Sequence, residues 1–321
     1  MRVRVWHNGP GPAGELRALP QAIAAGAEVF GDGGNCGFGE GVNRLLATSD
    51  AAVSIVANPD LVLAPGCTSA LVAALASSGA VVTGGLLTTG ETPPRVNAFR
   101  QRLTLDLVGI NTDRGRLASE LIAEVEGDRP RDRHGGPSSA PHRGFLGPSG
   151  ALFAVDRARH AAQVGGPLLP RALFLYLEEV AFWIRLRRHG AGIAFEPRAQ
   201  AVHGFSQSVG QRSARKLYHI ERNRLWLARA LWGTPRALAL LPFTGLRYAA
   251  YLVAGLGRPG GSEGQQGDGG AELIRAFRTA LREGLGAPLP QDLVEYLRAG
   301  SDAALSPYFA PLRAQLKNPV A

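Results

Sequence analysis

The stretch GGNCGFGEGVNR, residues 33–44, places glycines at alternate positions, namely Gly37, Gly39 and Gly41. An apolar run at 27–30 precedes it and a helix-like pattern over 42–47 follows it, so it is predicted to join a strand to a helix. A dinucleotide-binding loop needs the spacing G-x-G-x-x-G, and the third glycine here comes one residue too early. The spacing therefore argues against an NAD site and favours a glycine-rich turn beside another ligand.

Short apolar runs alternate with helical patterns over the first two hundred residues, which predicts an α/β sheet domain. Strands are expected at 3–6, 27–30, 54–57, 80–87, 151–155, 193–195 and 199–202, and helices at 13–25, 68–77 and 178–189. The run 54–57 is expected to be a buried strand that stops at Asn58-Pro59-Asp60. The charged, Pro- and Gly-rich segment 128–141 is expected to be a mobile loop.

The composition fits one large α/β domain with an appendage, because 45% of the 321 residues are apolar and supply a sizeable core. Two cysteines, Cys36 and Cys67, cannot form a disulfide framework and suit a reducing cytoplasm. The N-terminus lacks the long apolar stretch of a signal peptide. The longest uncharged run, 61–90, is broken by proline and glycines, so a buried helix and strand are favoured over a membrane span.

The C-terminal third is basic. The net charge is +9, and the segment 212–258 holds nine basic residues against one acidic residue, Glu221. We expect a basic amphipathic helical region at 211–257, a Gly-rich linker at 258–270 and a helical tail at 271–321. Arginines interleaved with Trp, Leu and Tyr are typical of helices that lie on a membrane surface. Packing against the α/β domain explains the same pattern equally well, and no nucleic-acid-binding module is present.

Five segments occur in one order along the chain: NCGFGEGVNR, ANPDLVLAPG, GFLGPSGALFAVDR, LFLYLEEVAFWIRLRRHG and AVHGFSQS. This series resembles the family-2 inverting glycosyltransferases, particularly the rhamnosyl- and galactofuranosyltransferase branch, over residues 3–230. The resemblance implies a GT-A-type fold, in which a Rossmann-like mixed sheet is flanked by helices. It places this nucleotide-diphospho-sugar transferase domain at residues 1–210, with a C-terminal helical extension.

Asp60 and His203 are the predicted metal ligands. Asp60 follows a strand, and ligands collect at the carboxyl ends of strands in open α/β sheets. The family's Asp-x-Asp is reduced here to Asn58-Pro59-Asp60, so one carboxylate would support Mg²⁺ or Mn²⁺ against a diphosphate. By resemblance, His203 is the late histidine that reaches the metal or the diphosphate. The simpler alternatives are a strand-ending turn and an ordinary polar histidine.

The resemblance also implies a donor site for a dTDP- or UDP-sugar. Its residues are Asn8, Gly37, Asn43, Asn58, Asp60, Gly150, Ser206 and Arg212. In the family the glycine loop packs beside the nucleotide pocket, and Gly150 would allow close approach of the backbone to a ligand. An arginine such as Arg212 suits phosphate oxygens. Alternatively, Gly150 belongs to a tight turn that enters a strand.

Glu178 and Glu179 are the candidate bases. They are flanked by apolar residues in the sequence, and the pKa of a carboxyl group in apolar surroundings rises toward neutral pH. By resemblance, Glu179 takes the place of the catalytic aspartate in Glu-Asp-x-Asp. Because this chain has Glu178-Glu179-Val180-Ala181, the base is one methylene longer and the second aspartate is an alanine. Alternatively, both glutamates simply favour a helix N-terminus.

Residues 3–9 match the family's second strand, so the first strand and helix are missing from this chain. A misassigned start is favoured over a degenerate member, because a missing central strand leaves sheet edges unpaired. We expect inverting sugar transfer to a cell-wall or surface glycan, or to a lipid-linked glycan, at the cytoplasmic face of the plasma membrane. The alternatives are a catalytically weak relative that binds a nucleotide-sugar or a partner enzyme, and a basic membrane-surface scaffold.

Overall fold

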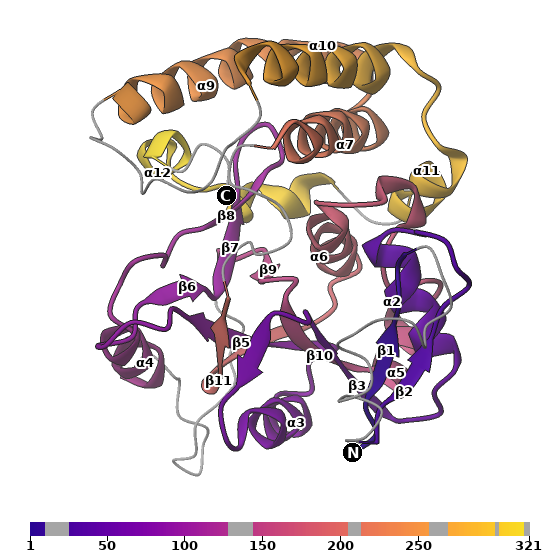
Figure 1. The fold of residues 1–321 in the computed structure, drawn as a ribbon, viewed down its shortest axis with the longest axis vertical. Helices are drawn as coiled ribbons and strands as arrows, with labels where there is room; N and C mark the ends of the chain where they lie inside the picture. Colours follow the sequence, from indigo (N-terminus) through magenta and orange to yellow (C-terminus); the bar gives the residue numbers. More distant parts are fainter. Residues whose placement is uncertain (10–25, 128–143, 205–212, 257–268, 299–301, 318–321) are drawn as a thin grey trace.

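The computed structural model describes residues 1–9, 26–127, 144–204, 213–256, 269–298 and 302–317 (Figure 1). These ranges contain a six-stranded mixed sheet with the order β3-β10-β5-β11-β4, and β6 pairs with β5. Strands β3, β5 and β11 run parallel to one another, and β10 and β4 run antiparallel to them. The bounds are Val53–Ala57 for β3, Leu61–Leu63 for β4, Val82–Thr88 for β5, Val96–Ala98 for β6, Leu152–Asp156 for β10 and Ile193–His203 for β11.

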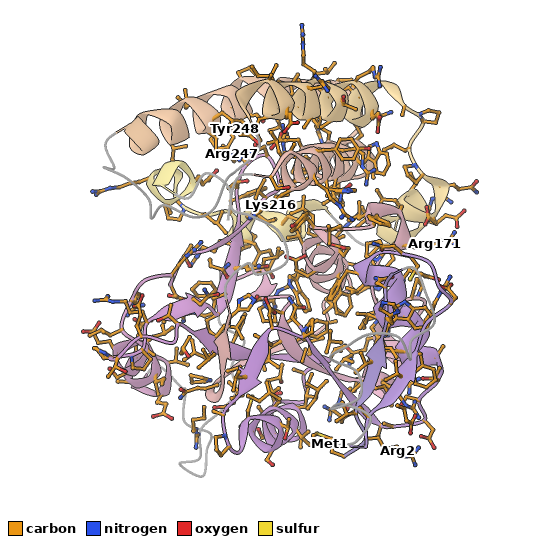
Figure 2. The ribbon with its side chains drawn as sticks, in the orientation of Figure 1. Met1, Arg2, Arg171, Lys216, Arg247 and Tyr248 are labelled. Carbon is orange, nitrogen blue, oxygen red and sulfur yellow. The ribbon has the colours of Figure 1, made fainter. Side chains whose placement is uncertain are left out.

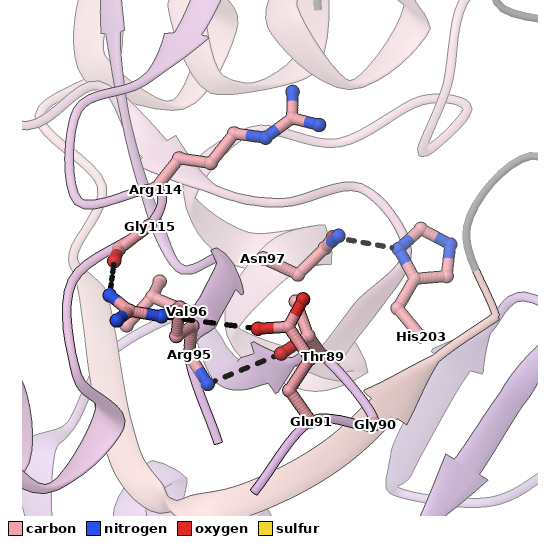
Figure 3. Close-up of a pocket in the computed structure, with 9 residues that line it drawn as sticks. All are labelled: Thr89, Gly90, Glu91, Arg95, Val96, Asn97, Arg114, Gly115 and His203. Atoms are coloured by element: carbon pink, nitrogen blue, oxygen red, sulfur yellow. Dashed lines mark hydrogen bonds and ion pairs between the residues drawn. The ribbon is translucent and has the colours of Figure 1, made fainter. Parts of the chain in front are cut away.

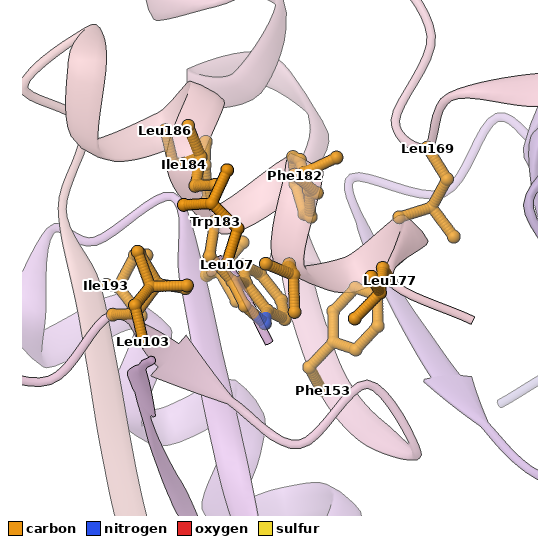
Figure 4. Packing of buried hydrophobic residues seen from close by; sticks show 14 of the residues in the cluster. Leu103, Leu107, Phe153, Leu169, Leu177, Phe182, Trp183, Ile184, Leu186 and Ile193 are labelled. Carbon is orange, nitrogen blue, oxygen red and sulfur yellow. The ribbon is translucent and has the colours of Figure 1, made fainter. Parts of the chain in front are cut away.

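The two faces of this sheet are covered by different helices, because successive side chains of a strand point to opposite faces. In β10, Leu152 packs in a cluster with α3 (Cys67–Ser78), whereas Phe153 packs in the larger core with α6 (Glu178–Arg188). Trp183 of α6 is fully buried there and packs edge to face on Phe153, with 5.2 Å between the ring centroids (Figure 4). Every residue of β5 is buried, so this uncharged strand forms the centre of the domain.

The N-terminal strands form a sheet of their own. Strand β1 (Arg4–Trp6) pairs in parallel with β2 (Glu28–Phe30), and α2 (Phe38–Ala47) packs against β1. In the described part of the chain, β1 pairs only with β2 and β3 pairs only with β10. The predicted helix at 13–25 lies outside the described residues. The absence of a first strand and helix stays a prediction.

A small antiparallel sheet lies between the central sheet and the C-terminal helices (Figure 1). Its order is β8-β7-β9, and Leu103 of β7 also bridges to Phe309 near the C-terminus. The remaining elements of this part are short and flank the two sheets. Their bounds are Arg100–Leu103 for β7, Gly109–Asn111 for β8, Ala118–Gly127 for α4, Gly147–Pro148 for β9, Arg157–Gln163 for α5 and Arg171–Leu173 for the 3₁₀ helix η2.

The C-terminal helices form a layer on the α/β domain (Figure 1). Helix α7 packs lengthwise against α10, and its Leu227 and Leu231 belong to the main core. A Cβ atom at Gly284 of α10 would lie 2.7 Å from Leu225, so glycine permits this close packing. The bounds are Ala214–Trp232 for α7, Thr234–Ala239 for α8, Leu241–Leu256 for α9, Gly270–Gly286 for α10, Gln291–Leu297 for α11, Asp302–Tyr308 for the 3₁₀ helix η3 and Leu312–Lys317 for α12.

Two arginines of the basic region are interior. Arg224 and Arg247 have 1% and 0% of their side chains exposed, and both contact Glu221 and Asp106. Figure 2 labels Arg247 beside Tyr248. The hydroxyl of Tyr248 donates to Glu221 at 2.7 Å. Buried charges need such pairing, since desolvating an unpaired one is costly. The expectation that the arginines of this region face lipid is therefore wrong for these two, and the packing alternative holds for α7.

Two further predictions about strands need correction. The expected strands 193–195 and 199–202 form one strand, β11, with an irregularity between Glu196 and Gln200 that the sequence pattern mistook for a break. Strand β3 was expected to be buried, but it is a half-exposed edge strand in which only Val56 is buried. The segment 128–141 lies outside the described residues, and the domain boundaries at 210, 257 and 270 stay predictions. None of the helices in the described ranges combines the length and the apolar character that a bilayer crossing requires.

Candidate active site

Three parallel strands of the central sheet end at the same edge, and polar residues follow each of them. Asn58-Pro59-Asp60 follows β3, Thr89 follows β5, and His203 ends β11. In open α/β sheets the carboxyl edge of the strands is the usual place for a ligand. The predicted metal ligands therefore lie at the edge where such a fold can bind a substrate.

Strand β4 brings Asp60 beside His203. It begins directly after Asp60 and pairs antiparallel with β11, so Leu61 lies opposite His203. The backbone N–H of Gly204 donates to the carbonyl oxygen of Asp60 at 2.9 Å. The side chains meet as well, with His203 Nε2 3.3 Å from Asp60 Oδ2. Residues far apart in the sequence thus form one adjacent carboxylate–imidazole pair.

The hydrogen bonds of His203 define what its Nε2 can bind. Nδ1 lies 3.0 Å from Oδ1 of Asn97, whose side chain is buried (Figure 3). An amide oxygen only accepts hydrogen bonds, so this contact favours the tautomer with the proton on Nδ1. Nε2 faces the Asp60 carboxylate, where a cation shared by the two side chains would fit. Histidines that bind metals usually donate their other ring N–H to such a carbonyl or carboxylate.

The residues around Asp60 fit a divalent cation. Asp60 Oδ1 is buried and has no hydrogen-bond partner among the described residues. A cation between Asp60 and His203 would satisfy this oxygen and Nε2 together. The described ranges contain no group of three or more His, Cys, Asp or Glu side chains that could hold a metal. Mg²⁺ and Mn²⁺ sites with few protein ligands are completed by phosphate oxygens and water, so a two-ligand site suits a diphosphate-bound cation.

A cleft of about 450 Å³ opens on the Asn97 side of His203 (Figure 3). Arg95 is fixed in its wall, because its Nη1 donates to the carbonyl oxygen of Gly115 at 2.8 Å. The volume lies in the range of small-molecule sites, and a second arginine adds to its basic character. The lining residues are Thr89, Gly90, Glu91, Arg95, Val96, Asn97, Arg114, Gly115 and His203.

Glu178 and Glu179 occupy the first turn of α6. Glu178 is 2% exposed, and its Oε1 lacks a hydrogen-bond partner in the described part of the chain. Glu179 is half-buried and lies against Gly150, where a Cβ atom would come within 2.7 Å of the Glu179 Cβ. The backbone N–H of Asn58 donates to the carbonyl oxygen of Ala151 at 2.9 Å, directly after Gly150. Glu179 therefore lies at the same sheet edge as Asn58 and Asp60.

Burial raises the pKa of both carboxyl groups. It raises the pKa of Glu178 to about 8, and the negative charge of Glu179 adds to this. Burial also raises the pKa of Glu179, but backbone N–H groups and the side chain of Gln101 bond to its carboxylate and oppose that rise. Carboxyl groups with raised pKa values are typical of acid–base sites. Glu178 is thus protonated at neutral pH, and the carboxylate of Glu179 is held by hydrogen bonds.

The segment that precedes α6 is strained. Phe174, Tyr176 and Leu177 have φ values of 64°, 67° and 68°. Side chains other than glycine disfavour this left-handed region, and each such residue costs on the order of 1–3 kcal/mol. Strain of this kind persists only where surrounding contacts impose it, and it clusters at functional sites. Its place directly before Glu178 and Glu179 supports a functional role for the start of α6.

The glycine loop makes close packing contacts. Gly37 has φ of 84°, and a Cβ atom there would lie 2.4 Å from the carbonyl oxygen of Phe174. At Gly41 a Cβ atom would lie 3.0 Å from the Trp6 ring. These glycines are therefore required for the fit of α2 between β1 and the strained segment, whatever else the loop binds.

Asn8 and Asn43 fasten the same region. Asn8 Nδ2 donates to the carbonyl oxygen of Gly37 at 2.8 Å, and its Oδ1 accepts from the backbone N–H of Cys36 at 2.9 Å. The Asn43 amide pairs with the backbone of Leu169, donating to its oxygen at 2.8 Å and accepting from its N–H at 3.1 Å. Both side chains thus have a structural role that the sequence did not indicate, and their contact with a donor stays a prediction.

Ser206 and Arg212 lie outside the described residues, so their predicted donor contacts stay untested. The sequence missed Asn97 and Gln101, which contact the proposed metal ligand and the proposed base. Asn97 lies on β6 and Gln101 lies on β7, and their spacing carries no motif. A signal for them would have required knowledge of which strands pair.

Solved structures show a similar fold. GalNAc-T7, crystallised with UDP, GalNAc and Mn²⁺, matches 90% of this chain and 52% of its own chain, with a TM-score of 0.52 and 14% identity. The chain thus spans about half the length of that protein. A mannosyltransferase from Pyrobaculum calidifontis in complex with GDP-Man and Mn²⁺ covers 89% of this chain and 78% of its own, with a TM-score of 0.44 and 11% identity.

No protein-family model and no curated protein sequence matches the chain. At 14% identity the likeness to GalNAc-T7 establishes the fold alone. Together with the mixed sheet and its flanking helices, it confirms the predicted fold class. The chain has a GT-A-type glycosyltransferase fold.

Proposed function

We propose that the protein transfers a sugar from a nucleotide-diphosphate donor to a hydroxyl group of a glycan acceptor, with inversion at the anomeric carbon. The observation that carries this proposal is the Asp60–His203 pair, 3.3 Å apart at the carboxyl edge of the sheet that also holds Glu179. The fold shared with GalNAc-T7, which was crystallised with UDP and Mn²⁺, supports it.

Asp60 and His203 would hold Mg²⁺ or Mn²⁺. Asn97 would prepare His203 for this role by accepting a hydrogen bond from Nδ1. The bound cation would neutralise negative charge that develops on the leaving diphosphate. Asn58 and Gly150 lie at the same edge and bound the place where the donor sugar would lie.

Glu179 would act as the general base. Its carboxylate takes the proton of the acceptor hydroxyl while that oxygen forms a bond to the anomeric carbon. The bond between this carbon and the diphosphate oxygen breaks on the opposite face, which inverts the configuration. A raised pKa suits this role, because a base whose pKa lies near the working pH transfers protons most effectively. Glu178 would stay protonated beside it and keep a second negative charge out of the site.

The substrates are proposed from the sequence resemblance. The donor would be a dTDP- or UDP-linked sugar of the rhamnose or galactofuranose kind, and the acceptor a cell-wall, surface or lipid-linked glycan. The cleft beside His203 would be the entrance for the acceptor, because it is open and is lined by one of the two proposed metal ligands, His203. We place the reaction at the cytoplasmic face of the plasma membrane, where such acceptors are assembled.

A second candidate function is nucleotide-sugar binding with little or no turnover. The position of the family's second aspartate is occupied by Ala181, which is fully buried in the core. A carboxylate is thus missing near Glu179 that the resembling family retains. In this case the protein would bind the donor or a partner enzyme at the membrane surface.

Thermal-shift binding with UDP, dTDP and GDP, each with and without Mn²⁺, tests the donor site. The proteins compared are wild type, Asp60→Ala and Asp50→Ala. The last is a control, because it removes an exposed aspartate that precedes β3, the strand that Asp60 follows. We expect one nucleotide to stabilise wild type and Asp50→Ala in the presence of Mn²⁺, and Asp60→Ala to lose this effect. Binding without release or transfer of the sugar would select the second candidate, and stabilisation by none of the nucleotides would overturn both.

A further inference from the structure

Helix α7 contacts the strained segment through several side chains, and the fully buried Asn223 makes most of the hydrogen bonds. Its Nδ2 lies 2.9 Å from the carbonyl oxygen of Leu173, 2.9 Å from that of Leu175 and 2.8 Å from that of Tyr176. Asn223 is fully buried, so water does not compete for these carbonyls. One amide group thus binds three backbone carbonyl groups in the stretch that leads into α6.

Arg222 fixes the orientation of this amide. Its Nε and Nη2 donate to Asn223 Oδ1 at 3.0 Å and 2.9 Å, so the NH₂ group must point to the carbonyls. Arg222 Nη2 also donates to the carbonyl oxygen of Leu173 at 3.1 Å. The guanidinium is held in turn over the ring of Trp226, 4.3 Å from its centroid. The contact between α7 and the segment is therefore a defined network.

The start of α6 depends on these contacts from α7. Leu177 occupies the N-cap position in a left-handed conformation, and leucine has no polar group with which to cap the helix. The neighbouring Phe174 is held from two sides, because its carbonyl oxygen accepts from the N–H of Phe38 at 2.9 Å and its ring stacks on His219. If the carbonyl groups of Leu175 and Tyr176 lost their hydrogen bonds to Asn223, the left-handed residues would relax and the first turn of α6 would move.

We propose that Asn223 is a positioning residue for the reaction: by holding the left-handed segment 174–177, it fixes where Glu179 presents its carboxylate. The inference rests on the proposed function. Glu179 is the second residue of α6, and it fills the space beside Gly150, where an added Cβ atom would lie 2.7 Å from its Cβ and 2.8 Å from its Cγ. A small shift of the first turn would therefore move the carboxylate away from Gln101 and from the acceptor.

The test compares matched variants of α7. Asn223→Ala removes the amide, and Arg222→Lys is a milder change that frees the amide but keeps the charge. Arg229→Lys is the control, because Arg229 is also half-buried on α7 but donates to Gly284 and Ala287 at the C-terminal end of α10, at 2.7 Å and 2.9 Å, and not to the segment before α6. Steady-state kinetics with the active nucleotide-sugar and hydrogen exchange of segment 173–180 are measured for each.

We expect Asn223→Ala to lower kcat by about 100-fold, the loss typical of a reacting group misplaced by about 1 Å, with the donor KM within about threefold of wild type. Arg222→Lys should show a smaller fall in kcat, and exchange in 173–180 should quicken in both variants. Arg229→Lys should keep the wild-type kcat and the wild-type exchange in this segment, even where its Tm falls.

Two outcomes would overturn the inference. One is a wild-type kcat in Asn223→Ala and Arg222→Lys with only a lower Tm, which would make the network purely structural. The other is unchanged exchange of 173–180 in both variants, which would mean that Asn223 does not hold the segment. A wild-type protein that binds nucleotide but transfers no sugar would instead refute the proposed enzyme, and the positioning role with it, whatever the exchange shows.

Discussion

Replacing Glu178 with glutamine should stabilise the protein increasingly as the pH rises. The carboxyl group is buried, its Oε1 has no hydrogen-bond partner within the described ranges, and it packs against Gly39 of α2. Burial, assisted by the charge of Glu179, raises its pKa from 4.5 to about 8. The folded protein therefore keeps a proton on Glu178 that the unfolded chain releases above pH 4.5.

The sign and the size of the effect follow from proton linkage. Because the folded state binds more protons than the unfolded state between these two pKa values, the unfolding free energy of the wild type falls as pH rises. Each pH unit is worth about 1.4 kcal/mol, so the loss between about pH 5 and about pH 8 is about 4 kcal/mol. Below pH 4.5 the contribution is fully present. Glu178→Gln has no proton to lose and escapes this decline.

Urea unfolding at about pH 5, 6.5 and 8.5 measures the effect for wild type, Glu178→Gln and Glu120→Gln, an exposed glutamate of α4. The quantity to compare is the difference in unfolding free energy between variant and wild type at each pH. A fixed offset from burying an amide cancels in this comparison. We expect the difference to grow by about 4 kcal/mol for Glu178→Gln and to stay flat for Glu120→Gln. A flat difference for Glu178→Gln would refute a raised pKa at this position.

Three predictions concern the proposed active site. Asp60→Asn should weaken Mn²⁺-dependent nucleotide binding at least about tenfold in calorimetry, because it removes the charged metal ligand, whereas Asp50→Asn should leave it unchanged. Glu179→Gln should lower kcat by about 10²- to 10⁴-fold with little change in donor KM, and the wild-type kcat/KM should rise with pH through a pKa above that of an ordinary glutamate, since the base must be deprotonated. Gly150→Ala should lower kcat by more than its loss of folded protein accounts for, because its Cβ would lie 2.7 Å from that of Glu179. A fall in kcat that only follows the loss of folded protein, measured by Tm, would contradict this reasoning.

The parts of the site that the sequence predicted are those set by strand ends and by helix starts. Asp60 and His203 were predicted from the family resemblance and because each follows an apolar run, and the sheet brings the two positions together at one edge. Glu178 and Glu179 were predicted because two carboxylates interrupt an apolar stretch and because Glu179 matches the family's catalytic aspartate. In both cases the sequence could indicate the position of the residues, because strand ends and helix starts follow from local pattern, whereas their roles stay predictions.

The parts that the sequence missed depend on contacts between distant segments. Asn43 pairs with Leu169, and Arg247 with Asp106, across more than a hundred residues, and no local pattern marks either partner. Asn223 is another such case, since its amide bonds to carbonyl groups that every residue carries. Backbone acceptors leave no trace in residue type, which is why positioning residues are the hardest to infer from a sequence.

The charge of the C-terminal region shows how composition can mislead about partners. The sequence, with nine cationic residues within 212–258, left open whether this region lies on a membrane surface or packs against the α/β domain. In the structure Arg224 and Arg247 neutralise buried carboxylates, and Arg222 and Arg229 donate to backbone carbonyls of neighbouring elements. Guanidinium groups suit this work, because they stay charged and present several donors in a fixed plane. A membrane or phosphate partner for this region must therefore be recognised by the cations that remain at the surface, while the interior arginines hold α7 where it can fix the start of α6.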